Sequence, residues 1–116
     1  MEHTTSLTEN YEFKRVYARG KSHVASAVVV YCRKNRSNNN RLGITVKVKV
    51  GKAVVRNRIR RRLREIYRLN EPRFARGFDI VLVARVCAAN CSYSQLQNSV
   101  LNSMRALGLV MDNERQ

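Results

Sequence analysis

The chain has 116 residues, 44% of them hydrophobic, which is enough for one domain around a single modest core. Its 23 lysines and arginines against 8 aspartates and glutamates give a formal net charge of +15, and a folded chain with this excess repels itself unless a polyanion neutralises it. No apolar run approaches the roughly 18 residues that span a bilayer, and the N-terminus lacks the apolar stretch of a signal peptide, so we expect a cytoplasmic protein that binds nucleic acid and no membrane.

The first predicted elements are a helix and a strand. Residues 8–19 are typical of a short helix, because Phe13, Val16 and Tyr17 recur at helical spacing. Thr8 is expected to cap this helix, and Gly20 to end it in a left-handed conformation. Residues 24–33 are rich in valine and alanine and favour a strand.

The middle of the chain changes from strand to helix periodicity. The polar run 33–41 predicts a solvated hairpin loop. In residues 42–50 apolar side chains alternate with glycine, threonine and lysine, which predicts a strand with one apolar and one basic face. Residues 53–69 have the period of a helix, with an apolar stripe made by Val55, Ile59, Leu63, Ile66 and Leu69.

The last predicted elements are a buried strand at 80–84 and a helix that follows it. Ser94 and Gln97 have the spacing of a capping box, the buried face is Leu96, Val100, Met104 and Leu107, and Gly108 is the expected terminator. The order αββαβα predicts an α+β, two-layer domain with a central sheet of about four short strands. We expect the domain to cover residues 8–109, with a flexible arm at 1–7 and a disordered tail at 110–116.

The helix at 53–69 contains the main chemical signal. It places six arginines in the nine residues 56–64, and Glu65 is the only acid between Gly51 and Asn70. Like charges at i, i+4 destabilise a helix unless phosphates lie opposite them, and the planar guanidinium can hold two phosphate oxygens. A solvated basic face is the alternative, but such faces normally mix both signs of charge. Arg58 and Arg62 lie off the main basic face.

An aromatic pair in the first helix predicts a second, weaker signal. Phe13 and Tyr17 are one turn apart, with Lys14, Arg15 and Arg19 beside them. Aromatic rings next to positive charge bind single-stranded nucleic acid, because every base has a face that can stack. Packing of both rings in the core is the alternative that these residues alone favour.

The sequence offers no catalytic group and no metal site. Its few acids are scattered, and no pair has the spacing of a two-metal site. The odd number of cysteines, Cys32, Cys87 and Cys91, argues against a disulfide framework, and they lack the paired spacing of zinc ligands. We therefore expect free thiols, and a chain that cannot cut RNA unaided.

Residues 49–61, Lys-Val-Gly-Lys-Ala-Val-Val-Arg-Asn-Arg-Ile-Arg-Arg, resemble the signature of the bacterial ribonuclease P protein family. The resemblance extends upstream to the aromatic residues of the first helix and downstream to Asp79–Arg85, so it covers roughly residues 10–108. One departure is Val48, which stands where the family commonly has a basic residue. Another is the polar sequence at residues 4–6, where the family arm is often basic.

The resemblance implies an αββαβα fold with a left-handed βαβ crossover and a role as the accessory protein subunit of an endoribonuclease. The catalytic RNA of ribonuclease P and precursor tRNA are the implied partners, with no small-molecule substrate, and Mg²⁺ is held mainly by the RNA subunit and the substrate. The implied RNA contacts are Lys49, Lys52, Arg56, Asn57, Arg60, Arg61, Arg64 and Arg68. A cleft for the 5′ leader of precursor tRNA is implied at Phe13, Tyr17 and Tyr31.

The leading alternative is a non-catalytic ribosomal or RNA-chaperone-type RNA-binding protein, which would share the charge, size and fold class. A DNA-binding protein ranks lower, because only Asn57 and Tyr67 could read bases from the arginine helix. Binding to a membrane surface ranks lowest, because the apolar face of that helix has no tryptophan or phenylalanine.

Overall fold

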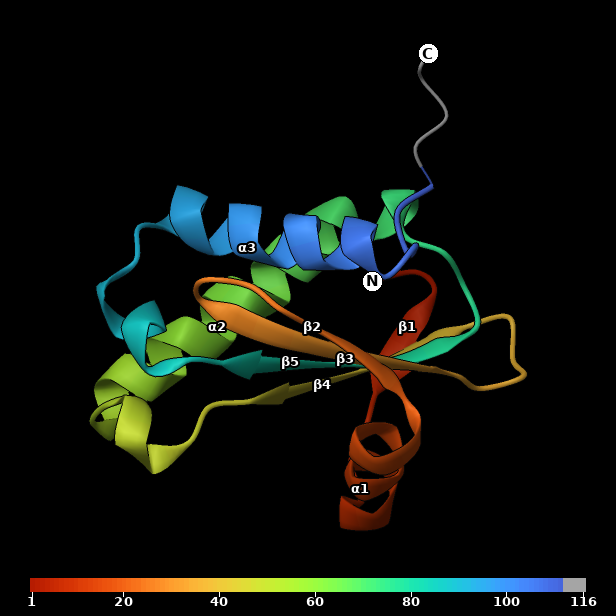
Figure 1. Ribbon diagram of the computed structural model, residues 1–116, viewed down its shortest axis with the longest axis horizontal. Coiled ribbons are helices and arrows are strands. Elements are labelled where there is room, and N and C mark those ends of the chain that lie inside the picture. The colour runs from red at the N-terminus through yellow and green to blue at the C-terminus, as the bar shows by residue number, and fades with distance from the viewer. Residues whose placement is uncertain (112–116) are drawn as a thin grey trace.

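The computed structural model describes residues 1–111 and shows a five-stranded sheet with three helices (Figure 1). This confirms the predicted α+β class. Three short 3₁₀ segments, η1 to η3, connect the longer elements. In chain order the elements are β1 (Thr4–Ser6), α1 (Asn10–Arg19), β2 (Lys21–Val24), β3 (Val28–Lys34), β4 (Asn40–Thr45), η1 (Val48–Val50), α2 (Ala53–Asn70), η2 (Glu71–Arg73), β5 (Phe78–Ala84), η3 (Val86–Asn90) and α3 (Tyr93–Ala106).

The sheet has the strand order β1-β4-β5-β3-β2. The strands β1, β4 and β5 are parallel to one another, whereas β3 is antiparallel to both β5 and β2. Strand β5 therefore lies between β3 and β4, and the predicted hairpin across residues 33–41 is wrong. Those residues do contain a loop, but it connects strands that are not neighbours, a pairing that local sequence cannot reveal.

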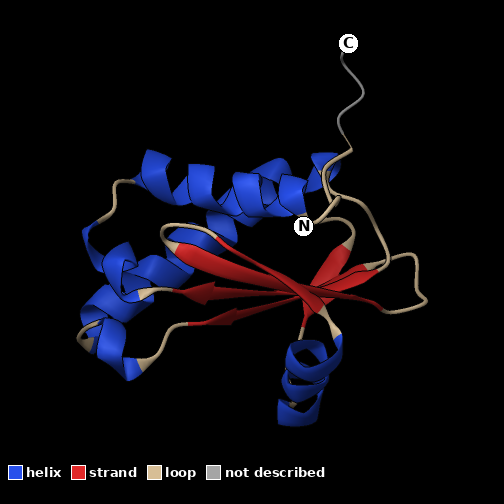
Figure 2. Cartoon of the chain, viewed as in Figure 1, coloured by secondary structure: helices blue, strands red, loops and turns tan. Residues whose placement is uncertain are grey.

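Helices cover both faces of the sheet, with α2 and α3 on one face and α1 on the other (Figure 2). The main core lies under α2 and α3 and includes Val30, Ile59, Leu82 and Met104, each no more than 1% exposed. A smaller cluster of Leu7, Val16 and Val81 lies under α1. Because α1 covers only part of its face, the rest of that face stays open to a ligand.

Helix α2 forms where predicted and ends one residue later. Its buried residues Ile59, Leu63 and Ile66 belong to the predicted apolar stripe. Leu69, also assigned to that stripe, is 56% exposed, and Tyr67 is buried in its place. The tyrosine can be buried because its hydroxyl group lies within hydrogen-bonding distance of Thr4 Oγ1 and Asn40 Nδ2.

The predicted strand 42–50 is too long. Strand β4 ends at Thr45, and residues 48–50 form the 3₁₀ turn η1, which leaves Val48 75% exposed. The alternating pattern continues past the strand because Val46 and Val50 are still buried, although from a turn.

Two predicted helix N-termini were also placed wrongly. Glu9, not Thr8, caps α1 through a capping box with Glu12, and Ser92 with Gln95, not Ser94 with Gln97, forms the capping box of α3.

Gly20 follows α1 in an extended conformation, not a left-handed one, and a side chain there would overlap the Cys32 carbonyl oxygen. Gly108 does adopt the predicted left-handed conformation, with φ of 75°.

The N-terminal residues differ from the expected flexible arm, because Thr4–Ser6 pair with Asn40–Leu42 as strand β1. The carboxylate of Glu71 accepts hydrogen bonds from the backbone N–H groups of Glu2 and His3 and from the hydroxyl of Thr4. This anchor lies 67 to 69 residues away in sequence.

At the other end, Val110 forms an isolated bridge with Phe74. Met111 donates its backbone N–H to the Arg73 carbonyl oxygen. Residues 112–116 of the expected disordered tail lie outside the described residues. Within residues 1–111, no helix has the length and hydropathy that a membrane crossing requires.

Candidate nucleic-acid interface

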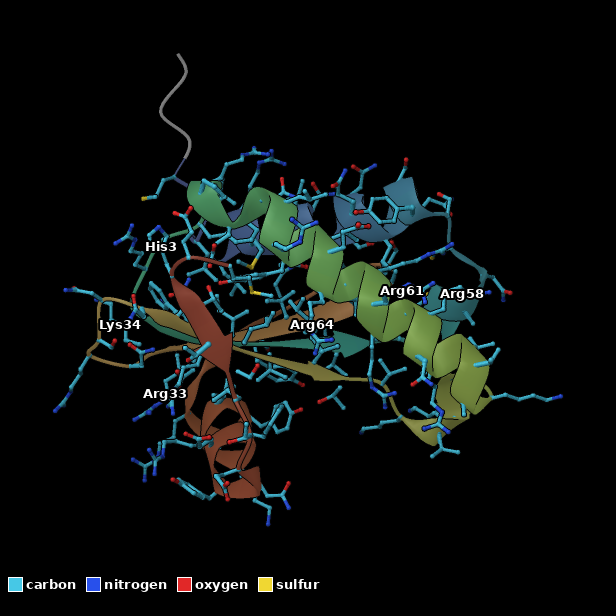
Figure 3. All side chains as sticks on the ribbon, turned by 180° about the vertical axis from the view of Figure 1, so that it is seen from behind. His3, Arg33, Lys34, Arg58, Arg61 and Arg64 are labelled. Carbon is cyan, nitrogen blue, oxygen red and sulfur yellow. The ribbon has the colours of Figure 1, made fainter. Side chains whose placement is uncertain are left out.

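Helix α2 presents a broad cationic surface on the side opposite the core. It contains seven arginines and one glutamate. Asn57, Arg61, Arg64 and Arg68 are exposed, and Arg56 and Arg60 are half-buried at the edge of this surface. Figure 3 shows Arg61 and Arg64 along one side of α2, and Arg64 lies at its border with the sheet, where it lines a cavity with Thr4 and Ile44. The structure therefore brings six of the eight predicted RNA contacts onto one helix face.

The preceding loop orients the two arginines at the edge of this surface. Arg56 Nε donates to the Gly51 carbonyl oxygen at 3.0 Å. Arg60 donates to the Val46 carbonyl oxygen at 3.3 Å and to Asn57 Oδ1 at 3.0 Å. Each arginine keeps further N–H groups for a phosphate, because a guanidinium has five.

Two arginines of α2 point elsewhere, as predicted. Arg58 reaches the Ala89 carbonyl oxygen of η3 at 3.5 Å, and Arg62 is half-buried. Arg68, by contrast, lies within the cationic surface, and it forms an exposed i, i+3 ion pair with Glu65 at 4.0 Å. Exposed pairs of this kind are weak, so Arg68 can exchange its partner for a phosphate.

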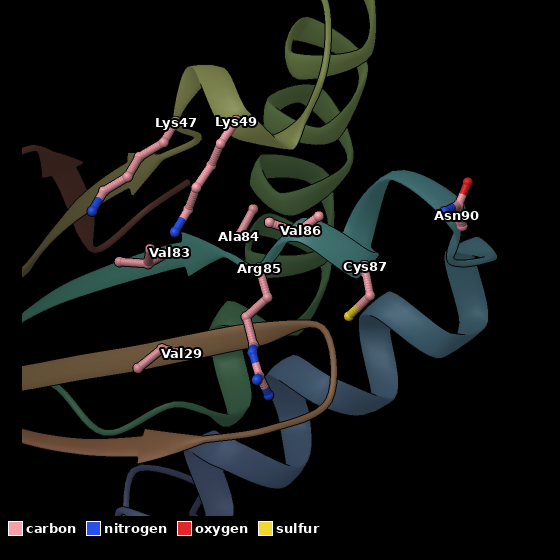
Figure 4. Close-up of a pocket in the computed structure, with 9 residues that line it drawn as sticks. All are labelled: Val29, Lys47, Lys49, Val83, Ala84, Arg85, Val86, Cys87 and Asn90. Carbon is pink, nitrogen blue, oxygen red and sulfur yellow. The ribbon is translucent and has the colours of Figure 1, made fainter.

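The two lysines predicted to contact RNA lie in different parts of the structure. Lys52 caps the N-terminus of α2 and is exposed. Lys49 instead points from η1 into an open pocket of about 690 Å³ beside the end of β5, where Lys47, Arg85 and the paired Val29 and Val83 also lie (Figure 4). Lysine and arginine side chains thus surround an apolar patch on the open part of the sheet face that α1 does not cover.

The three predicted cleft aromatics gather between α1 and the sheet. The rings of Tyr17 and Tyr31 meet edge to face with centroids 4.9 Å apart, and Phe13 lies 6.5 Å from Tyr17. Tyr17 is 38% exposed, and its hydroxyl lies 3.1 Å from Thr45 Oγ1. Both are among the residues that line a shallow cavity of about 310 Å³, together with Asn10, Phe13 and Lys14.

Phe13 combines the two roles that the sequence left open. A side chain at Gly43 would overlap its ring, so the phenylalanine packs closely against the backbone of β4 at this glycine. Phe13 therefore fixes α1 to the sheet and also leaves part of its ring in the cavity. Tyr17, the more exposed ring, is the better stacking platform.

One arginine that the sequence analysis did not single out holds α1 in place. Arg41 Nε and Nη2 donate to the two carboxylate oxygens of Asp79 at 2.8 and 2.7 Å, and Nη1 bonds to Glu12 of α1. Asp79 is 1% exposed. The backbone N–H of Glu9, the largest influence, and Arg41 together hold the pKa of Glu12 below its usual range. The only sequence signal for this role was an arginine alternating with apolar residues in a strand.

The described residues offer no protein-based hydrolytic centre. No group of three or more histidine, cysteine, aspartate or glutamate side chains in residues 1–111 could hold a metal ion. The three cysteines are free thiols, as predicted, and burial raises the pKa of Cys32 and Cys91. Glu12 of α1 and Asp79 of β5 are both bonded to Arg41. The arrangement of arginines, lysines and aromatic rings can bind and position a polyanion.

Comparison with known proteins identifies relatives along most of the chain. The family model described as ribonuclease P matches residues 1–108. A ribonuclease P protein component of Clostridium kluyveri is 45% identical over 105 residues, which cover 89% of this chain and 94% of that one. The ribonuclease P protein of Staphylococcus aureus superimposes with a TM-score of 0.84 at 32% identity, over 90% of this chain and 96% of that one. The protein from Thermotoga maritima gives 0.77 at 36%, over 84% and 92%.

Proposed function

The chain belongs to the bacterial ribonuclease P protein family, and we propose from this that it binds the catalytic RNA of ribonuclease P and the 5′ leader of precursor tRNA. It acts as the accessory subunit of an endoribonuclease that removes the leader and produces the mature 5′ end of the tRNA. The observation that carries the proposal is the separation of two RNA-compatible surfaces by the sheet: arginines on α2 and aromatic rings under α1.

The α2 surface faces the catalytic RNA in this proposal. The contacts are Lys52, Arg56, Asn57, Arg60, Arg61, Arg64 and Arg68, and Lys49 completes the set from η1. Within the described chain, Glu65 is the only acid on α2, so little negative charge competes with phosphates. Neutralising RNA phosphates releases counterions, and this makes binding strongly dependent on salt.

The aromatic cleft receives the leader. Tyr17 and Tyr31 offer ring faces and edges for unpaired bases, and Phe13 supports them from the sheet. The neighbouring pocket supplies Lys47 and Arg85 as cations along the same sheet face. A leader strand can therefore stack on the aromatic rings while its phosphates meet these cations.

The chemistry of cleavage resides in the RNA. In this proposal Mg²⁺ is held mainly by the RNA subunit and the substrate, whose phosphate oxygens are hard ligands of the kind that Mg²⁺ prefers. The protein lowers the repulsion between two RNAs and adds affinity for the leader, which orients the precursor at the catalytic RNA. Both partners are cytoplasmic RNAs, and we assign the chain to the bacterial cytoplasm.

The test is cleavage of precursor tRNA at low magnesium by a bacterial ribonuclease P RNA alone, by the protein alone and by the mixture. We expect activity from the mixture and none from the protein alone. Cleavage by the purified protein would contradict the assignment of the chemistry to RNA. Tight, salt-sensitive RNA binding without any gain in cleavage would favour the ribosomal or chaperone alternative.

A further inference from the structure

A second cationic pocket lies at the end of the sheet that holds the loop 35–39. Its cavity of about 280 Å³ is lined by Arg19, Gly20, Lys21, Cys32, Arg33, Lys34, Phe78 and Leu107. Cys32 and Phe78 belong to the core under α2 and α3, whereas the cleft aromatics belong to the cluster under α1. We call the residues that line this cavity the distal pocket. It is separate from the aromatic cleft.

The charges of the distal pocket have no partner in the described chain. Arg19 ends α1, Lys21 begins β2, and Arg33 and Lys34 end β3. None of these four side chains makes an ion pair or hydrogen bond within residues 1–111. The nearest acid, Asp79, lies opposite Arg33 in the sheet but is occupied by Arg41 and Asn35. Four cations without an anion favour a polyanionic ligand.

The floor of the distal pocket is apolar. Phe78 and Leu107 are half-buried there and Cys32 is buried, and burial raises the pKa of the Cys32 thiol, so it stays protonated at neutral pH. An aromatic ring beside an apolar floor, with arginine and lysine around the rim, is the combination that binds an unpaired nucleotide. Double-stranded RNA does not fit this description, because its bases are already stacked and its phosphates are recognised on a convex helix.

The distal pocket lies away from the α2 surface. Figure 3 shows Arg33 and Lys34 at the opposite end of the molecule from Arg61 of the α2 surface. A catalytic RNA bound along α2 therefore leaves these residues free for another strand.

The cleft and the distal pocket share two elements. On α1, Tyr17 of the cleft is followed two residues later by Arg19 of the pocket. On β3, Tyr31 and Arg33 have the same spacing, which is about 7 Å along a strand. A leader that leaves the cleft around the C-terminal end of α1 therefore meets Arg19 and Arg33 within a short length of chain.

We infer that the distal pocket binds an unpaired nucleotide of the precursor leader, upstream of the part held in the aromatic cleft. This rests on the proposed function, because it takes the leader to lie in that cleft. Long leaders would then bind through two sites, and short leaders through the cleft alone.

The test compares two precursors with the assembled holoenzyme, one with a leader of about 4 nucleotides and one of about 16, the range of site sizes of single-strand-binding domains. The variant is Lys21→Ala with Lys34→Ala, since both lysines are exposed and make no hydrogen bond. We expect the long-leader precursor to lose roughly tenfold in affinity and its salt slope to become shallower by about 1.4, because each single-strand phosphate contact contributes about 0.7. The short-leader precursor should bind as before.

The matched control is Arg36→Ala with Arg105→Ala, which removes the same charge from exposed positions outside the pocket lining. An unchanged long-leader affinity, or an equal loss in the control, would overturn the inference. So would an equal loss with both precursors, or a matching loss of affinity for the catalytic RNA, which would identify that RNA as the ligand. The proposed function is judged separately, by cleavage of the short-leader precursor with the unaltered protein.

Discussion

Replacement of Arg41 by methionine should strongly destabilise the domain, because Arg41 neutralises the buried carboxylate of Asp79. Asp79 is 1% exposed and accepts two hydrogen bonds from Arg41, at 2.8 and 2.7 Å, and one from Asn35 at 3.0 Å. Without Arg41 this carboxylate stays buried with one neutral donor. Stranding a buried charge in this way costs about 3–5 kcal/mol, whereas replacing both partners of such a pair is often nearly neutral.

Urea and thermal unfolding followed by circular dichroism, at one fixed salt concentration, measure this cost. For a domain of this size a loss of 3–5 kcal/mol lowers the melting temperature by about 12–20 °C, at roughly 4 °C for each kcal/mol. The double variant Arg41→Met with Asp79→Asn should recover at least about 2 kcal/mol, because the stranded charge is gone.

Arg33→Met is the control, since Arg33 lies opposite Asp79 in the sheet but makes no bond to it. A loss below about 1 kcal/mol in the single variant, or no recovery in the double variant, would refute the reasoning.

Three further outcomes follow from the geometry. In a filter-binding assay, Tyr17→Ala should weaken binding of leader-bearing precursor tRNA by about 1–3 kcal/mol and leave the binding of mature tRNA unchanged. Tyr17→Phe loses only the contact with Thr45 and should bind the precursor almost normally. Arg61→Ala with Arg64→Ala should make the salt slope of binding to the catalytic RNA shallower by about 1.4–1.8 without changing the preference for leader-bearing precursor. An altered preference would place these arginines at the leader. Burial alone would raise the pKa of Glu71, but hydrogen bonds from Thr4 and from the Glu2 and His3 N–H groups lower it. Ionised Glu71 therefore stabilises the fold above its unfolded pKa near 4.5. This stabilisation is lost as the pH falls through the lower folded pKa. Hydrogen exchange of residues 4–6 should therefore rise in acid, and Glu71→Gln should remove that pH dependence.

The features that the sequence predicts well are those set by local periodicity. The apolar side chains from Ile59 to Ile66 share one face only if the segment is a helix, and the arginines between them then lie on the other side. The aromatic spacing of Phe13 and Tyr17 likewise places both rings on one side of α1, and the structure adds Tyr31 from β3.

The features that escaped prediction depend on partners distant in sequence. Strand β1 has no apolar alternation, and it forms because Glu71 and Asn40 supply its hydrogen bonds. The insertion of β5 between β3 and β4 depends on pairing across tens of residues. Arg41 could not be separated from the arginines that face solvent, because its partners Glu12 and Asp79 come from two other elements.

The capture of the N-terminus by Glu71 also sets an order for folding during synthesis. Residues 2–4 are made well before their anchor, which follows about 70 residues later and only after all of α2 has been made. Contacts of such long sequence separation form late and slow the folding of small domains. Strand β1, which covers the edge of β4, therefore docks late, and until then that edge is open to pairing with other chains. Because the nascent chain is strongly basic, an RNA can bind along α2 at this stage, and the bound RNA would keep other chains away from the open edge.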